Sequence, residues 1–88
     1  MYRLEIPKPV QRQIDALPGR YRQRVRCILV ALMDNPRPPN AEPLRGEPNR
    51  YKIRLDNYRI AYRIEEGILL VEVLKVGLKF GPEFYEGI

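Results

Sequence analysis

Basic and apolar side chains alternate along two neighbouring stretches of the sequence. The first stretch, YKIRL, carries Lys52 and Arg54, and the second, YRIAYRI, carries Arg59 and Arg63. Successive side chains of a β-strand point to opposite faces, so each stretch, read as a strand, places its cations on one side. Guanidinium and ammonium groups bind phosphate oxygens, the guanidinium through paired hydrogen bonds. The pattern therefore predicts a cationic surface that binds the phosphates of RNA.

We call this surface the basic face and define it by the side chains Arg50, Lys52, Arg54, Arg59 and Arg63. Asp56 is the only acidic residue between Arg50 and Ile64. Like charges opposite one another destabilise paired strands, and a bound phosphate backbone relieves that repulsion. The alternative interpretation is that the basic face is only the solvent-exposed side of a sheet.

Length and composition predict one small basic domain. The chain has 88 residues, which predicts a single domain spanning residues 1–88, and its formal net charge is +5. The only cysteine, Cys27, lies in an apolar stretch, where we expect a buried side chain. The sequence contains no secretion signal and no apolar run long enough to cross a membrane. We therefore expect a cytoplasmic protein without a membrane partner.

The first part of the chain predicts a short strand followed by two helices. YRLEI has the pattern of the strand, and apolar residues then recur at helical spacing from Val10 to Leu17. Pro18-Gly19 ends this helix, and a second helix is predicted from about Arg20 to Asp34. Because the turn between them is short, the two helices should form an antiparallel hairpin.

The rest of the chain predicts a proline-rich loop and then three antiparallel strands. Five prolines between Asn35 and Pro48 exclude a helix or a central strand there. Strands are predicted at residues 50–55, 58–64 and 68–76, the last of them buried on both faces. We expect an α+β fold: a small antiparallel, meander-type sheet of about four strands, with the N-terminal helical hairpin packed on one face.

Several short motifs follow one another in a characteristic order. LRG at residues 44–46 is followed by YKIRL, by YRIAYRI, by a hydrophobic strand ending in VG and by a tyrosine near the end of the chain. This order resembles the RelE family of toxins from bacterial and archaeal toxin–antitoxin modules, within the wider RelE/ParE superfamily. The resemblance covers nearly the whole chain and is strongest from Leu44 to Tyr85. It implies a RelE-like fold and an mRNA interferase, an endoribonuclease that cleaves messenger RNA in the ribosomal A site and so inhibits translation.

The resemblance also implies partners. RelE-like toxins are neutralised by a cognate antitoxin protein that wraps around them, and the complex usually represses its own operon. For this chain it therefore implies an antitoxin partner and mRNA on the ribosome as substrate. Operator DNA is expected to be contacted only indirectly, through the toxin–antitoxin complex.

The family's functional positions match individual residues of this chain. Lys52 and Arg54 match the two basic residues of the first hairpin strand, and Arg59 matches the arginine after the turn. Lys79 follows the VG motif, where relatives often have arginine, and Tyr85 matches the tyrosine that comes next. These five are the expected catalytic residues. The further RNA contacts that we expect are Arg45, Arg50 and Arg63.

Cleavage of RNA by its own 2′-hydroxyl requires a general base, a cation beside the phosphorane and an acid for the leaving 5′-oxygen. The chain has no histidine, and no cluster of carboxylates is predicted on the basic face, so we expect neither a metal site nor a cofactor. Surrounding cations should lower the pKa of Lys52 and Tyr85, which makes either a candidate base. Arg59 and Lys79 should stabilise the phosphorane, and Arg54 should position the phosphate or protonate the leaving group.

Two other functions are compatible with the same resemblance. A ParE-like toxin has the same fold but inhibits DNA gyrase and cleaves no RNA. The segment Leu78–Gly81 favours it slightly, because it holds fewer charges than the matching segment of RelE toxins. The complete set of Lys52, Arg54, Arg59 and Tyr85 favours the ribonuclease. An inactive family member would bind only the antitoxin or operator DNA.

Overall fold

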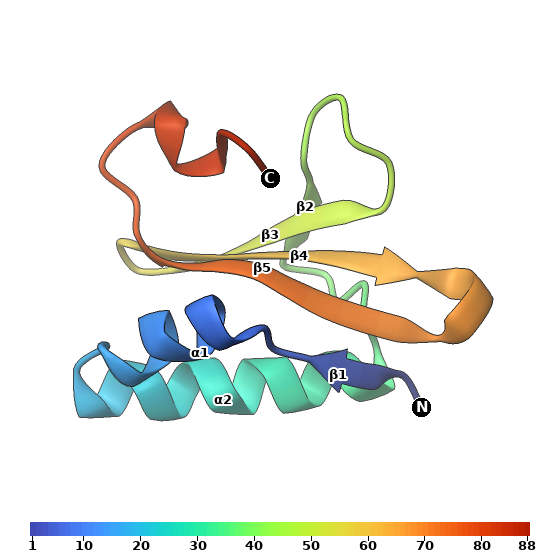
Figure 1. The fold of residues 1–88 in the computed structure, drawn as a ribbon, viewed down its shortest axis with the longest axis horizontal. Coiled ribbons are helices and arrows are strands. Elements are labelled where there is room, and N and C mark those ends of the chain that lie inside the picture. The colour runs from blue at the N-terminus through green and yellow to red at the C-terminus, as the bar shows by residue number, and fades with distance from the viewer.

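In the computed structural model, which describes residues 1–88, a sheet separates two helices from the C-terminal tail (Figure 1). The elements in chain order are β1 (Arg3–Glu5), α1 (Lys8–Asp15), α2 (Gly19–Asp34), β2 (Ala41–Pro43), β3 (Arg50–Leu55), β4 (Tyr58–Glu65), a 3₁₀ turn η1 (Glu66–Ile68), β5 (Leu70–Leu78) and a second 3₁₀ turn η2 (Pro82–Tyr85). The predicted α+β class, the helical hairpin and the meander of β3, β4 and β5 are confirmed.

The sheet has five strands in the order β1-β5-β4-β3-β2, and it is mixed rather than purely antiparallel. The strand not expected is β2, which forms inside the proline-rich loop and pairs antiparallel with β3. Pro43 is tolerated there because an edge strand leaves one side of its backbone unpaired. β1 runs parallel to β5. A long connection separates these two strands, so the tight turn that makes sequential neighbours antiparallel does not constrain them.

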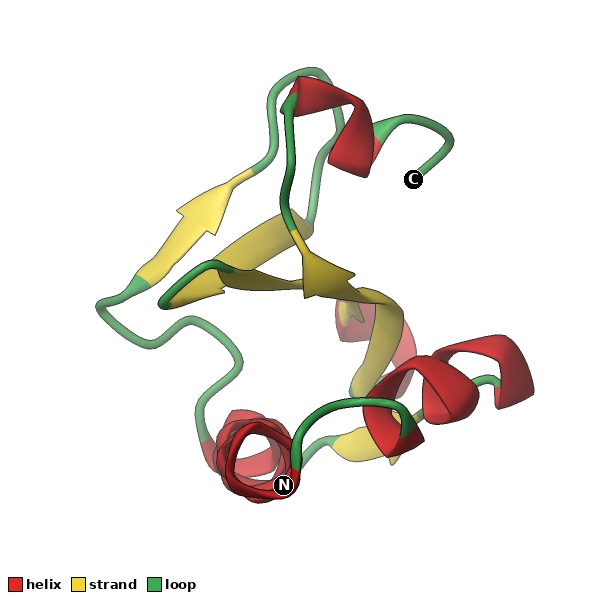
Figure 2. Ribbon diagram, turned by 90° about the vertical axis from the view of Figure 1, so that its left-hand side faces the viewer, coloured by secondary structure: helices red, strands yellow, loops and turns green.

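The hydrophobic core lies between the sheet and the two helices, which cover the same face (Figure 2). The helices contribute Val10, Ile14, Val25, Leu29 and Leu32, and the strands contribute Ile53, Ile60, Tyr62, Ile64, Val71, Val73 and Val76. Neither helix combines the length and the apolar character that crossing a bilayer requires.

Cys27 is exposed, so the expectation of a buried thiol was wrong. The apolar run CILVALM contains both faces of α2, and a rotation of about 100° per residue turns position 27 away from the side of Val25 and Leu29. Val30 is exposed on the same helix for the same reason.

β5 is an interior strand, as predicted, but it is buried mainly on one face. Ala61 of β4 pairs with Lys75, while the next residue, Tyr62, pairs with Val73, so Leu74 has no partner. This bulge shifts the alternation of side chains along β5. Because cross-strand partners share a face, Lys75 and Gly77, which pair with Ala61 and Arg59, lie on the basic face.

Tyr62 connects the sheet to the proline-rich loop. Its side chain is completely buried, and its hydroxyl donates a 2.7 Å hydrogen bond to the backbone carbonyl of Pro36. Burial also raises the pKa of Tyr62. The bond ties the start of the segment that carries β2 to the centre of the sheet.

We expect Tyr62→Phe to lower the free energy of unfolding by about 1–3 kcal/mol, because it leaves the Pro36 carbonyl buried without its donor. Urea unfolding followed by circular dichroism measures the change. Tyr2→Phe is the matched control, since the Tyr2 hydroxyl bonds to Glu66 at the surface and water replaces it. Equal losses in the two variants would contradict the importance of the buried bond.

Candidate active site

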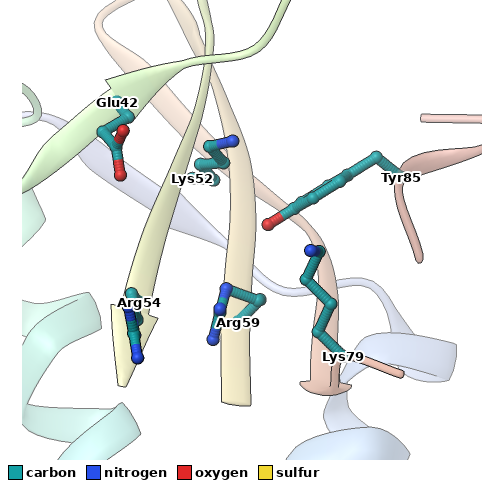
Figure 3. A pocket seen from close by; sticks show the side chains of 6 residues that line it. All are labelled: Glu42, Lys52, Arg54, Arg59, Lys79 and Tyr85. Carbon is teal, nitrogen blue, oxygen red and sulfur yellow. The ribbon is translucent and has the colours of Figure 1, made fainter. Parts of the chain in front are cut away.

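The five residues expected to be catalytic line a single cleft on the basic face (Figure 3). The cleft has a volume of about 130 Å³, and its lining consists of Glu42, Lys52, Arg54, Arg59, Lys79 and Tyr85. These side chains come from β2, β3, β4, the segment after β5, and η2. The fold thus brings together residues that are separated widely in the sequence.

Strand register determines which charges meet in the cleft. Arg54 of β3 lies directly opposite Arg59 of β4, so two guanidinium groups occupy neighbouring positions. Glu42 of β2 lies directly opposite Lys52 of β3, which brings one carboxylate to the border of the cationic group. The cleft is therefore cationic along β3 and β4 and acidic at the β2 edge.

The turn between β3 and β4 holds the two arginines. Asp56 adopts a left-handed conformation with φ of 54°, and its carbonyl accepts hydrogen bonds from Arg59 Nη1 at 2.9 Å and Arg54 Nε at 3.4 Å. The carbonyl of Tyr58 also accepts from Arg59 Nη1 at 2.9 Å. The backbone N–H of Lys79 donates a 3.0 Å hydrogen bond to the carbonyl of Asn57, the second residue of the turn. One tight turn therefore organises three of the four cations.

The C-terminal tail lies on the basic face and delivers Tyr85 to the cleft. Lys75 Nζ donates a 2.8 Å hydrogen bond to the carbonyl of Phe84 and lies 4.4 Å from the centroid of its ring. Phe84 is buried and packs edge-on against the Tyr85 ring, with centroids 5.0 Å apart. Lys75 is the side chain that attaches η2 to the sheet.

Tyr85 points its hydroxyl into the cleft, between Lys52 and Lys79 (Figure 3). Lys52 Nζ lies 5.2 Å from the centroid of the Tyr85 ring, a cation–π contact. The hydroxyl oxygen is buried and has no hydrogen-bond partner. Buried polar groups are nearly always bonded, so an unbonded hydroxyl in a cleft indicates a place where a ligand supplies the partner.

The expectation that the pKa of Tyr85 lies below its ordinary value was wrong. Burial raises the pKa of Tyr85 above its ordinary value, and the nearby Arg59 guanidinium opposes this shift without reversing it. The phenol therefore keeps its proton at neutral pH. Tyr85 is suited to donate a hydrogen bond and is not suited to act as a general base.

The three further residues expected to contact RNA lie in different surroundings. Arg63 forms hydrogen-bonded ion pairs with Glu72 and Glu65, which also raise its pKa, and it does not line the cleft. Arg50 is 3.9 Å from Glu47 and likewise lies outside the cleft. Arg45 lines an adjoining hollow. The basic face thus has one end neutralised by carboxylates and one end, at the cleft, rich in free cations.

Glu42 is the cleft residue that sequence reasoning missed. It lies among the prolines of residues 36–48, where no strand was predicted, and the pairing that brings it beside Lys52 exists only once β2 has formed. The sequence contains no pattern that relates an acid in that segment to a lysine in β3.

Comparisons with known proteins agree on the family. Residues 4–78 match the family model described as the ParE toxin of the type II toxin–antitoxin system parDE. The mRNA interferase toxin RelE of Escherichia coli (strain K12) is 30% identical over 86 residues, which cover 96% of this chain and 90% of the relative.

Solved structures give the same result. The crystal structure of the isolated E. coli RelE toxin aligns with a TM-score of 0.81 and 29% identity, covering 97% of this chain and 92% of that one. A chain of the archaeal RelE–RelB complex from Pyrococcus horikoshii OT3 aligns with a TM-score of 0.79 and 25% identity. The alignment covers 90% of this chain and 96% of that one. On sequence and fold together, this chain belongs to the RelE/ParE family of toxins from type II toxin–antitoxin systems.

Proposed function

We propose that this toxin is an endoribonuclease that cleaves messenger RNA on the ribosome in the cytoplasm. The observation that carries the proposal is the cleft, in which a carboxylate, four cations and an unbonded tyrosine hydroxyl surround one space. Such a set can bind a phosphate and move two protons around it. The 30% identity to proteins named mRNA interferase supports the same activity.

Arg54, Arg59 and Lys52 form the phosphate-binding part of this mechanism. The two arginines are fixed beside one another by the turn carbonyls, so their donors are oriented before substrate arrives. The phosphorane carries more negative charge than the ground-state phosphate. Oriented cations therefore stabilise the phosphorane more strongly than they stabilise the ground state. The Tyr85 hydroxyl gains an acceptor when a phosphate oxygen enters the cleft.

Glu42 and Lys79 are the proton-transfer pair of the proposal. Displacement at phosphorus brings the nucleophile in and the leaving group out on opposite sides, so the base and the acid must flank the phosphate. Figure 3 shows the Glu42 carboxylate on one side of the cleft and the Lys79 ammonium on the other. A carboxylate can accept a proton, whereas an arginine cannot give one up.

The reaction then balances without a further reactant. Glu42 takes the proton of the 2′-hydroxyl while the 2′-oxygen forms a bond to phosphorus. The bond from phosphorus to the 5′-oxygen breaks, and Lys79 transfers a proton to that oxygen. The products are a 2′,3′-cyclic phosphate and a free 5′-hydroxyl. Lys52, which contacts the Tyr85 ring and lies opposite Glu42, balances the phosphate charge.

An antitoxin is the proposed protein partner. Solved relatives include the E. coli RelBE toxin–antitoxin complex, which aligns with a TM-score of 0.80, and the archaeal RelE–RelB complex. The free cations of the cleft offer an acidic peptide a complementary surface. Operator DNA is reached only through that complex in this proposal.

A gyrase-inhibiting toxin is the second candidate, because the matching family model is described as the ParE toxin. The cleft favours the ribonuclease, since binding gyrase requires no base and acid on opposite sides of a phosphate site. Induced expression with mapping of messenger RNA ends separates the two functions. New ends within translated codons support the ribonuclease, whereas toxicity without new ends, together with inhibited supercoiling, supports the gyrase inhibitor.

Arg59→Ala should reduce single-turnover cleavage of mRNA on programmed ribosomes by roughly 100- to 1,000-fold, the usual effect of removing one oriented transition-state donor. The Arg59 side chain lies on the basic face and outside the core, so the melting curve should change little. Arg12→Ala, an exposed arginine on α1, is the matched control and should cleave normally. Normal cleavage by folded Arg59→Ala would remove this residue from the mechanism.

Glu42→Gln keeps the size of the side chain but removes its ability to accept a proton. We expect kcat for single-turnover cleavage to fall roughly 100-fold or more. Tyr85→Phe should lower the rate without changing its pH dependence across the neutral range, because the raised pKa of Tyr85 leaves the phenol protonated there. A full rate in Glu42→Gln would assign the base to another group. Glu5→Gln on β1 controls for the change in charge.

Lys75→Met should misplace Tyr85, because the tail loses the hydrogen bond to the Phe84 carbonyl. Small displacements of catalytic groups reduce rates strongly, so we expect kcat to fall at least tenfold with little change in KM. Lys75→Arg retains a donor and should recover most of the loss. A full rate in Lys75→Met would show that the tail is positioned without Lys75.

A further inference from the structure

The strand that carries Glu42 has few backbone bonds of its own. β2 has three residues, lies at the edge of the sheet and pairs only with β3. Proline has no backbone N–H, so Pro38, Pro39 and Pro43 donate no hydrogen bond to the sheet. The backbone ladder therefore holds the Glu42 carboxylate weakly, and side chains must supply the remaining contacts.

Arg37 is a side chain of the segment before β2 that neither phosphate binding nor proton transfer uses. Its Nε donates a 3.0 Å hydrogen bond to the Tyr51 hydroxyl, and its Nη1 donates a 2.7 Å hydrogen bond to the Glu66 carboxylate. The guanidinium also lies 5.6 Å from the centroid of the Tyr51 ring, a cation–π contact. One planar group thus joins this segment to β3 and to the turn before β5.

Tyr51 holds both ends of the segment 37–43. Its hydroxyl accepts the hydrogen bond from Arg37, and its backbone pairs with Pro43. We call segment 37–43, closed in this way on Tyr51, the bracket. Glu42 is the residue next to the paired end of the bracket, and Figure 3 shows its carboxylate at the β2 edge of the cleft.

The bracket is stiff between its two ends. Three of the seven residues 37–43 are prolines, whose φ is fixed by the ring. The backbone N–H of Ala41 donates a 2.9 Å hydrogen bond to the carbonyl of Pro38, which closes a tight turn within the segment. In a stiff segment, a displacement of the first residue also displaces the last ones. The position of Arg37 therefore affects the position of Glu42.

The alternative interpretation is that Arg37 serves only the stability of the fold. Its ion pair with Glu66 is exposed, with 42% and 47% of the two side chains accessible, and exposed ion pairs contribute little to global stability. Hydrogen bonds from Arg37 and Tyr2 lower the pKa of Glu66, so the pair stays charged at neutral pH. Loss of Arg37 should therefore loosen the bracket without unfolding the protein.

We propose that Arg37 is a positioning residue for RNA cleavage, which fixes the bracket on Tyr51 and thereby holds the Glu42 carboxylate at the cleft. Arg37 does not line the cleft, so it acts on the reaction only through Glu42. The inference rests on the proposed ribonuclease with Glu42 as its base, and it names the contact that makes this base effective.

The first test measures single-turnover cleavage of mRNA on programmed ribosomes by Arg37→Ala. The maximal rate should fall roughly tenfold, because small displacements of a catalytic group reduce rates strongly. The half-saturating toxin concentration should change little, since Arg54 and Arg59 keep their contacts with the turn. Arg12→Ala removes the same charge from α1 and should cleave at the wild-type rate.

The second test is a double-mutant cycle that a purely structural role would not satisfy. Arg37→Ala should slow the wild-type toxin but should not slow Glu42→Gln any further, because that variant has no base left to position. A residue that only stabilises the fold would reduce the rate by the same factor in both backgrounds. Tyr51→Phe, which keeps the ring and removes the acceptor, should cause a smaller loss with the same dependence on Glu42.

The outcomes separate this inference from the proposed function. A full rate in Arg37→Ala, or equal losses in both backgrounds, would overturn the positioning role and leave the ribonuclease intact. A full rate in Glu42→Gln would overturn Glu42 as the base and this inference with it, while cleavage itself stands. Absence of cleavage by wild type would overturn the ribonuclease and the inference together. If Arg37→Ala does not fold, the same cycle with Tyr51→Phe decides the question.

Discussion

Two arginines facing one another across paired strands are the constraint on which the site depends. Arg54 and Arg59 repel, and such a pair destabilises a sheet by roughly 0.2–1 kcal/mol. The neighbouring pair in the same register is Ile53 and Ile60, both fully buried beneath the helices. Each buried isoleucine contributes about 1.5–3 kcal/mol. The free energy gained by burying the isoleucines therefore exceeds the cost of the repulsion, and the strand pairing holds the two charges together. The Asp56 carbonyl then aligns the two guanidinium groups.

The rest of the basic face shows how the chain limits this repulsion to one place. At the far end Arg63 is paired with Glu72 and Glu65, and Arg50 is near Glu47. Carboxylates thus neutralise the cations at this end of the basic face. At the cleft the only carboxylate is Glu42, which forms no ion pair within 4.0 Å. The uneven distribution of acids therefore concentrates the cations without carboxylate partners at the cleft, although the sequence pattern is basic along its whole length.

Local patterns were sufficient to predict most of the fold and the cationic part of the site. The alternation of basic and apolar residues in β3 and β4 predicted which of their side chains share a face. Features that depend on contacts between distant segments were not predictable in this way. Neither the β2 edge strand nor the bulge at Leu74 has a signature in its own residues. For the same reason Glu42 and Lys75 were missed, and the burial that raises the pKa of Tyr85 was overlooked.

The parallel pairing of β1 with β5 has a consequence for the synthesis of the toxin. The first strand to leave the ribosome finds its hydrogen-bonding partner only in residues 70–72, close to the end of the chain. Contacts between such distant segments form late, because closing the long loop costs entropy before the strands are joined. Tyr85 is added later still. A nascent chain therefore lacks a complete sheet and cleft until residues 70–85 have emerged, and the same topology that builds the sheet delays the completion of the cleft.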